Sequence, residues 1–112
     1  MSPDDRIRLQ HMRDAAEAAR RFCGGRTRPD LDSDDMLRFA LTRAVQIIGE
    51  AASKVSHEAR AETSRVPWAA VVGMRNRLVH AYFDVDADIL WTTVTESLPA
   101  LLSELQSTLG KD

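Results

Sequence analysis

The sequence predicts an all-α protein, a single antiparallel four-helix bundle over residues 1–112 with a kinked last helix. Apolar residues recur at three- and four-residue steps in four segments, which is the period of a helix with one buried face. No segment alternates apolar and polar residues as a half-buried strand does, and the chain has neither an internal repeat nor a low-complexity tail. These observations favour one helical bundle with one modest core.

The first helix is predicted to run from about Pro3, with Ser2 as its cap, to Phe22. Gly24 and Gly25 follow, and such a pair ends a helix. The predicted buried stripe consists of Ile7, His11, Ala15, Ala18, Ala19 and Phe22.

The second helix follows a polar loop that contains Pro29, and either Asp32 or Ser33 is predicted to cap it. Gly49 lies in its middle at a cost of ~1 kcal/mol in helix propensity, which indicates that another helix approaches there. The helix has a wide apolar face made of Met36, Leu37, Ala40, Leu41, Ala44, Ile47, Ile48, Ala51 and Ala52.

The last two helices are predicted beyond a polar stretch, residues 57–65, that can form a short helical turn. Pro67 opens the third helix, in which Trp68 is a packing anchor, as Trp91 is in the fourth. An acidic loop at residues 84–86 separates the two helices, and Pro99 is predicted to kink the fourth. The apolar stripe of the fourth helix, predicted to be core or dimer surface, is Leu90, Val94, Leu98, Leu101, Leu102, Leu105 and Leu109.

Composition excludes several classes of protein. The formal net charge of −2 provides no overall basic field, so any contact with RNA is expected to be local. No apolar run approaches the ~20 residues that span a bilayer, and residues 1–21 do not resemble a signal peptide, so we expect a cytoplasmic protein without membrane contact. The single cysteine, Cys23, can form no internal disulfide and is expected to be at least half-buried.

The segment from Met74 to Phe83, M-R-N-R-L-V-H-A-Y-F, concentrates the chemically versatile side chains. On an ideal helix, Tyr82 would lie about 20° from Arg75 and His80 about 40° from Asn76, which forms two adjacent stripes. Arg75 and His80 would then lie about 140° apart, so they converge only if the arginine bends around the helix, the helix end loosens, or a second copy contributes. No Asp, His or Cys cluster has the spacing of a metal site.

Structural roles for these residues remain open alternatives. Arg75 and Arg77 could form ion pairs with acidic residues in the 84–88 region, and Tyr82 could be a core residue with a solvated hydroxyl. His11 and His57 are interpreted as packed or solvated residues without a catalytic role.

The motif resembles that of the HEPN superfamily, and within it the HepT toxins of HepT/MntA toxin–antitoxin pairs. HepT proteins carry Arg, four residues, His, one residue and Tyr, and this pattern is met by Arg75, His80 and Tyr82, with Asn76 after the arginine. The resemblance extends over most of the chain, through I-I-G-E-A-A at 47–52, V-P-W at 66–68, I-L-W-T-T-V at 89–94 and L-P-A-L at 98–101.

The resemblance implies a metal-independent endoribonuclease that needs no cofactor and in which the ribose 2′-hydroxyl attacks the adjacent phosphate. His80 would transfer protons, since the ordinary pKa of an imidazole is about 6.5. Arg75 would bind the phosphate and stabilise its added charge, and Asn76 would orient the imidazole or the phosphate. The active site of HEPN nucleases lies between two protomers, which implies a homodimer.

The resemblance also implies a partner, an MntA-like nucleotidyltransferase antitoxin that attaches AMP to Tyr82. The added phosphodiester would bring negative charge and bulk to the place where the RNA phosphate binds. Two alternatives stay open: a non-catalytic helical module that binds a nucleotidyltransferase, and a structural dimer with degenerate chemistry.

Overall fold

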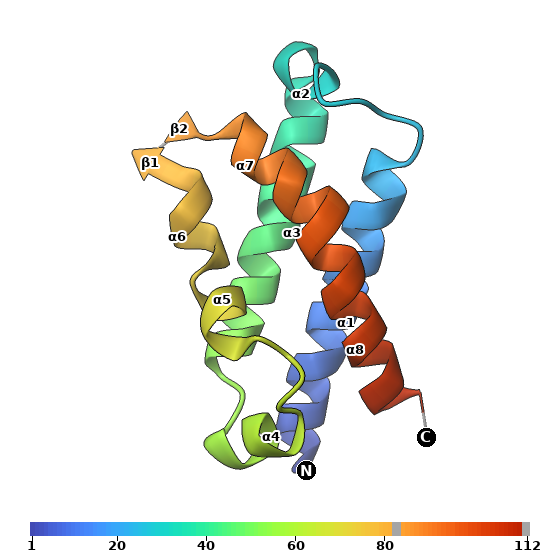
Figure 1. Cartoon of the computed structure of the whole chain (residues 1–112), viewed down its shortest axis with the longest axis vertical. Coiled ribbons are helices and arrows are strands. Elements are labelled where there is room, and N and C mark those ends of the chain that lie inside the picture. Colours follow the sequence, from blue (N-terminus) through green and yellow to red (C-terminus); the bar gives the residue numbers. More distant parts are fainter. Residues whose placement is uncertain (82–83, 111–112) are drawn as a thin grey trace.

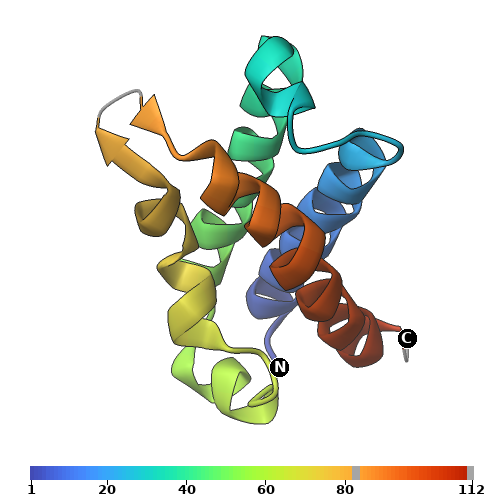
Figure 2. The ribbon, with the colours of Figure 1, turned by 45° about the horizontal axis from the view of Figure 1, so that its top comes forward.

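Four helical units run antiparallel, which confirms the predicted all-α fold class (Figure 1). The computed structural model describes residues 1–81 and 84–110, except for the side chains of residues 75, 79–81 and 84. The units are α1 (Pro3–Cys23), α3 (Asp35–Ser53), the pair α5–α6 (Trp68–Val72 and Met74–Leu78), and the run from α7 (Ala87–Thr92) to α8 (Leu98–Leu109). Helix α1 packs against both α3 and α8, and Figure 2 shows the last unit crossing over the first two.

Helix α1 begins and ends where the sequence predicts. The Ser2 hydroxyl accepts a hydrogen bond from the Asp5 N–H at 3.1 Å, and Pro3 is the first residue of the helix. The helix ends at Cys23, which is half-buried, and Gly25 follows with a φ of 74°, in the left-handed region that glycine adopts without strain.

The predicted buried stripe of α1 is wrong at Ile7 and Phe22, which are each 43% exposed. His11 is exposed, in agreement with its interpretation as a packed or solvated residue. Leu9 and Met12 are fully buried instead. Helix α1 carries two overlapping apolar stripes, and the one with these two long flexible side chains faces α3 and α8.

Helix α3 follows the short helix α2 (Asp30–Ser33), and its cap is Asp34 rather than Asp32 or Ser33. The Asp34 carboxylate accepts a hydrogen bond from the Leu37 N–H at 3.1 Å. Most of the predicted apolar face is buried, but Met36 is 82% exposed. The predicted approach at Gly49 is confirmed, because a Cβ there would stand 3.7 Å from the Val72 carbonyl oxygen of α5.

The predicted short turn is α4 (His57–Glu62), and a buried carboxylate attaches it to α1. Asp5 accepts hydrogen bonds from the Ser56 N–H at 2.9 Å and the Ser56 hydroxyl at 2.6 Å. The bond from the Ser56 hydroxyl is the main cause of a lowered pKa for Asp5. Trp68 is buried as predicted, and its indole N–H donates to the Thr63 carbonyl oxygen at 3.2 Å.

The fourth helical unit contains a π-helical segment, η1 (Thr93–Ser97), between α7 and α8. The irregularity predicted at Pro99 therefore begins one turn before the proline. Pro99 has no N–H to donate to the Thr95 carbonyl, and its ring crowds that oxygen, so the preceding turn widens. The apolar stripe of this unit lies in the core, and every predicted member from Leu90 to Leu109 is buried.

Candidate functional site

The candidate motif does not lie on one continuous helix, as the sequence-based geometry assumed. Helix α6 ends at Leu78, and β1 (Val79–Ala81) pairs antiparallel with β2 (Asp84–Val85). Arg75 and Asn76 are therefore helical, whereas His80 lies in a strand. The angles expected from an ideal helix, including the 140° between Arg75 and His80, do not apply.

The helix ends at Leu78 because its backbone finds another partner. The Leu78 carbonyl oxygen accepts a hydrogen bond from the Asp86 N–H at 2.7 Å, a contact across the hairpin. The Leu78 side chain is fully buried, so it anchors this end of α6 in the core. Asp86 also begins α7, since its carboxylate accepts from the Ile89 N–H at 2.9 Å. One residue thus closes the hairpin and starts the next helix.

The structure describes the predicted site residues to different extents. Asn76 is exposed on α6, one residue after Arg75. The backbones of Arg75 and His80 are described but their side chains are not, and Tyr82 lies outside the described residues. The predicted roles of these four residues, and the convergence of Arg75 with His80, stay predictions.

Arg77 is the described cation of the motif, and among the described residues its predicted pairing with Asp88 is not found. Its side chain is exposed and forms no ion pair with any acidic side chain that the structure describes. Asp88, one of the acidic residues considered as its partner, binds Arg28 instead, with 2.6 Å between the Arg28 Nε and an Asp88 carboxylate oxygen. Sequence reasoning missed this pairing because the two residues are 60 positions apart.

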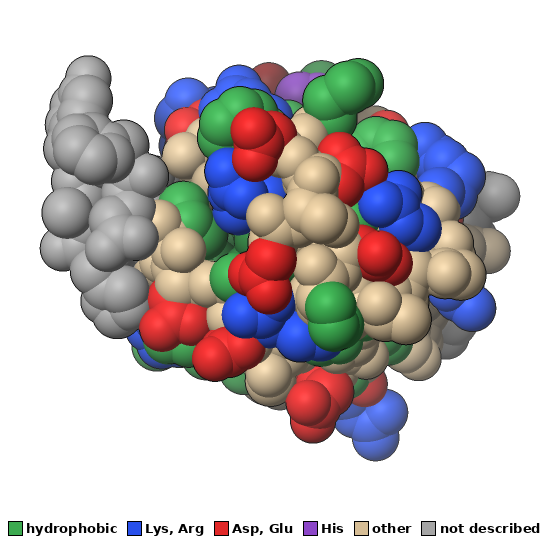
Figure 3. Space-filling view, turned by 90° about the horizontal axis from the view of Figure 1, so that it is seen from above, with side chains coloured by type: hydrophobic (Ala, Val, Ile, Leu, Met, Phe, Trp, Pro, Cys, Tyr) green, Lys and Arg blue, Asp and Glu red, His purple; other side chains and the backbone are tan. Residues whose placement is uncertain are grey.

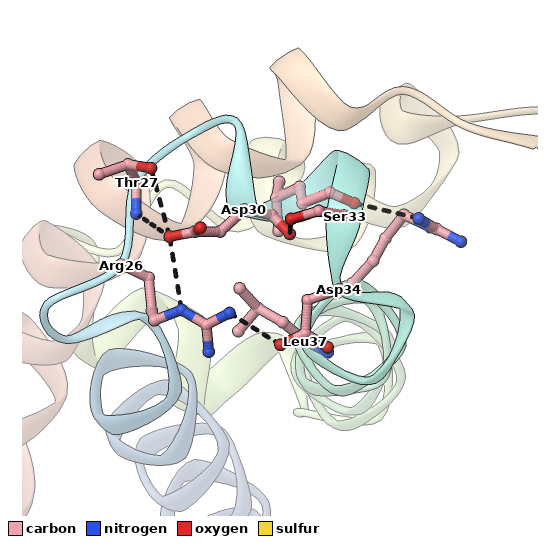
Figure 4. Close-up of polar contacts among 8 residues, drawn as sticks. Arg26, Thr27, Asp30, Ser33, Asp34 and Leu37 are labelled. Atoms are coloured by element: carbon pink, nitrogen blue, oxygen red, sulfur yellow. Dashed lines mark hydrogen bonds and ion pairs between the residues drawn. The ribbon is translucent and has the colours of Figure 1, made fainter.

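The connection between α1 and α3 supports this end of the bundle. Figure 4 shows Arg26 between two carboxylates, 3.4 Å from Asp30 and 2.7 Å from Asp34. The hydrogen bond from Arg26 is the main cause of a lowered pKa for Asp34. Arg28 extends the network, since it contacts Asp32 at 3.1 Å as well as Asp88 of α7. The network therefore connects the α1–α3 loop to the helix that follows the hairpin.

Charge at this end of the molecule is mixed. In Figure 3, which views the bundle from the end that carries α2 and the hairpin, basic and acidic side chains alternate over the described surface. That pattern agrees with the net charge of −2, so contact with a polyanion would depend on particular arginines. Among the described residues, no group of three or more His, Cys, Asp or Glu side chains is placed to hold a metal ion, and no helix could cross a membrane.

The comparisons with known proteins all point to one family. Residues 12–108 match the family described as "Ribonuclease HepT-like", a range that includes the whole motif. The chain is 34% identical over 104 residues to a protein named "Putative RNase" from Caldanaerobacter subterraneus subsp. tengcongensis, and the match covers 93% of each chain. It is 34% identical over 98 residues to "Probable ribonuclease HepT" of Thermococcus cleftensis, covering 88% of this chain and 89% of that protein. No solved structure gives a significant match.

Proposed function

The chain belongs to the HepT-like ribonuclease family, and we propose that it is a cytoplasmic toxin that cleaves RNA without a metal ion. The observation that carries the proposal is the motif itself, with Arg75 and His80 inside the matched range and the spacing typical of HepT. The helix-to-strand change at Leu78 lies between these two residues. It supports the proposal because it removes the helical constraint that separated them by about 140°.

In the proposed reaction, the ribose 2′-oxygen attacks the adjacent phosphorus. The 2′-oxygen–phosphorus bond forms, the bond to the 5′-oxygen breaks, and a cyclic phosphate remains. One His80 takes the proton of the 2′-hydroxyl, and the His80 of the second copy, in its protonated form, gives a proton to the leaving 5′-oxygen. Arg75 binds the non-bridging oxygens, where negative charge grows in the transition state. Asn76 orients the imidazole or the phosphate.

We propose that the active form is a homodimer, with Arg75 and His80 of two copies around one cleft. The described surface supports this through exposed apolar side chains where α1 ends and α3 begins. Phe22 and Met36 line one hollow there, and Met36 and Phe39 of α3 are 82% and 65% exposed. Burial of such side chains against a second copy is favourable.

We propose that covalent modification switches the toxin off. An MntA-like nucleotidyltransferase would attach AMP to Tyr82, two residues after His80, and so place a phosphodiester in competition with the RNA phosphate. The test is co-expression with an MntA-like nucleotidyltransferase, followed by intact-mass measurement. We expect the mass of one or more AMP groups on the wild type and none on Tyr82→Phe, which should remain toxic. Full neutralisation of unmodified Tyr82→Phe would overturn this mode of control.

The test of catalysis is incubation of the purified, unmodified protein with total RNA in the presence of EDTA. Loss of a proton-transfer group costs about 10²–10⁴-fold in rate, so we expect His80→Ala to reduce cleavage by that factor. Removal of one charge-stabilising group costs about 10²–10³-fold, which is the loss expected for Arg75→Ala. His57→Ala and Arg21→Ala are the matched controls, because both residues are exposed on other helices.

Expression of the chain alone should stop growth, and His80→Ala should restore it. If the unmodified wild type neither cleaves RNA nor affects growth, the chain is better explained as a non-catalytic module that binds a nucleotidyltransferase.

The dimer is tested by native mass. Met36→Glu places a charge on the exposed apolar surface of α3 and should convert the dimer to a monomer, with cleavage reduced. Ser103→Glu adds the same charge to an exposed position of α8 and should leave the dimer intact. A dimer that persists in both variants would exclude this surface as the interface.

A further inference from the structure

A groove runs between α5–α6 on one side and η1–α8 on the other, directly beside the motif. Its middle section has a volume of about 350 Å³, which is the size of a pocket for a small ligand. An upper hollow of about 330 Å³ shares Arg77 and Ser97 with it. A lower hollow of about 450 Å³ shares Arg65 and Glu104 with it. Because neighbouring sections share residues, the three hollows form one groove.

The two arginines that border the middle section form no ion pair with any residue that the structure describes. Arg65 and Arg77 are exposed, and neither forms an ion pair with an acidic side chain in the described part of the chain. The arginines of the α1–α3 connection behave differently, since Arg26 and Arg28 each contact two carboxylates. Guanidinium groups that have no carboxylate partner among the described residues, one on each border of a groove, are suited to bind phosphate oxygens.

The floor between these arginines is apolar and firmly held. Val71, Met74 and Leu101 are buried beneath it, and the exposed residues Pro67, Ala70 and Ala100 provide its apolar surface. An apolar surface can pack against the face of any nucleobase while the charged borders bind the backbone. Acidic residues also line the groove: Glu62 lies in the lower hollow, Glu104 borders both the lower and the middle sections, and Asp88, which is paired with Arg28, lines the upper hollow.

We propose that this groove binds single-stranded RNA next to the cleavage site, with a phosphate at Arg77, a base on the apolar floor and a further phosphate at Arg65. The inference rests on the proposed ribonuclease function, since Arg77 is separated from Arg75 by one residue and from His80 by two. An amphipathic helix of a partner protein could also fill an apolar groove. The unpaired cations on both borders favour the polyanion.

The test measures binding rather than cleavage, so that it is independent of the chemistry. The probe is a fluorescent 12-nucleotide 2′-O-methyl RNA, which lacks the 2′-hydroxyl needed for attack, and the readout is anisotropy at several salt concentrations. Arg65→Ala should weaken binding about tenfold at low salt. It should also reduce the slope of log K against log salt by about 0.7, the value for one phosphate of a single strand.

Ala100→Phe provides a second, uncharged test, because Ala100 is an exposed residue of the groove and a phenyl ring there would cover the floor. It should weaken binding with the salt slope unchanged. Arg21→Ala and Ser103→Phe are the matched controls on α1 and α8, outside the groove, and both should bind like the wild type.

The outcomes separate this inference from the proposed function. If the wild type cleaves RNA but Arg65→Ala and Ala100→Phe bind the probe with unchanged affinity and slope, the groove assignment is wrong and the ribonuclease stands. If the groove variants lose binding while the wild type shows no cleavage, the groove stands and the proposed reaction fails. Absence of binding by the wild type would overturn the groove directly.

Discussion

Two neighbouring segments at the same end of the bundle use their arginines in opposite ways. In the α1–α3 connection, Arg26 and Arg28 each pair with two carboxylates, and these ion pairs hold loops and helices together. On α6, by contrast, Arg77 is exposed and unpaired among the described residues, beside a groove. The comparison indicates that the first segment is structural support and that the second is available to a charged ligand.

The largest expected effect comes from the end of α6, where the side chain of Leu78 is fully buried. Leu78→Ala should lower the free energy of unfolding by about 2–5 kcal/mol, because it leaves a cavity at the end of α6. RNA cleavage should fall with it, since the hairpin loses its anchor. Urea unfolding and a cleavage assay on the same sample measure both effects, and a change below about 1 kcal/mol would contradict the anchoring role.

The comparison itself is tested by removing one arginine from each segment. Arg77→Ala should weaken RNA binding about tenfold and leave the thermal midpoint unchanged, because its exposed guanidinium forms no ion pair within the described part of the chain. Arg26→Ala should do the reverse: it releases Asp30 and Asp34, lowers the thermal midpoint and leaves RNA affinity unchanged. Equal effects of both variants on stability and affinity would remove the distinction between the segments.

Acid should weaken the supporting segment. The hydrogen bond from Arg26 lowers the pKa of Asp34 below the ordinary value of 3.8. The folded state therefore favours the ionised Asp34 carboxylate. The contact with Arg26 stabilises the fold above pH 3.8, and this stabilisation is lost as the pH falls through the lowered pKa of Asp34 in the folded state. Asp34→Asn keeps a capping side chain but not the charge, so the thermal midpoint of this variant should depend less on pH between 5 and 2. Asp35→Asn, at the next position, is the control; an equal loss of pH dependence in both would argue against the Arg26 contact.

The smallest effect is expected at Gly49. A Cβ there would lie in ordinary contact with the Val72 carbonyl oxygen at 3.7 Å, so alanine fits without displacement of α5. Gly49→Ala should therefore stabilise the protein by up to about 1 kcal/mol through helix propensity. Destabilisation in urea unfolding would show that the two helices lie closer than this distance.

Sequence reasoning identified α4, the buried stripe of α8 and the approach at Gly49 because each depends on local periodicity or on one residue type. It chose the wrong stripe on α1, since an alanine-rich helix offers two apolar faces and only the neighbouring helices select one. It extended the motif helix past Leu78 because periodicity cannot detect a hydrogen bond from Asp86, eight positions away.

The amino-acid sequence is sufficient to determine the all-α fold class, the N-terminal cap of α1 at Ser2 and the family motif from Arg75 to Tyr82. Each of these depends on residues within a few positions of one another. Tertiary structure alone decided which arginines are paired and where α6 gives way to a strand. Ion pairs such as Arg28 with Asp88, and the hydrogen bond that ends α6, join residues that meet only after the chain has folded.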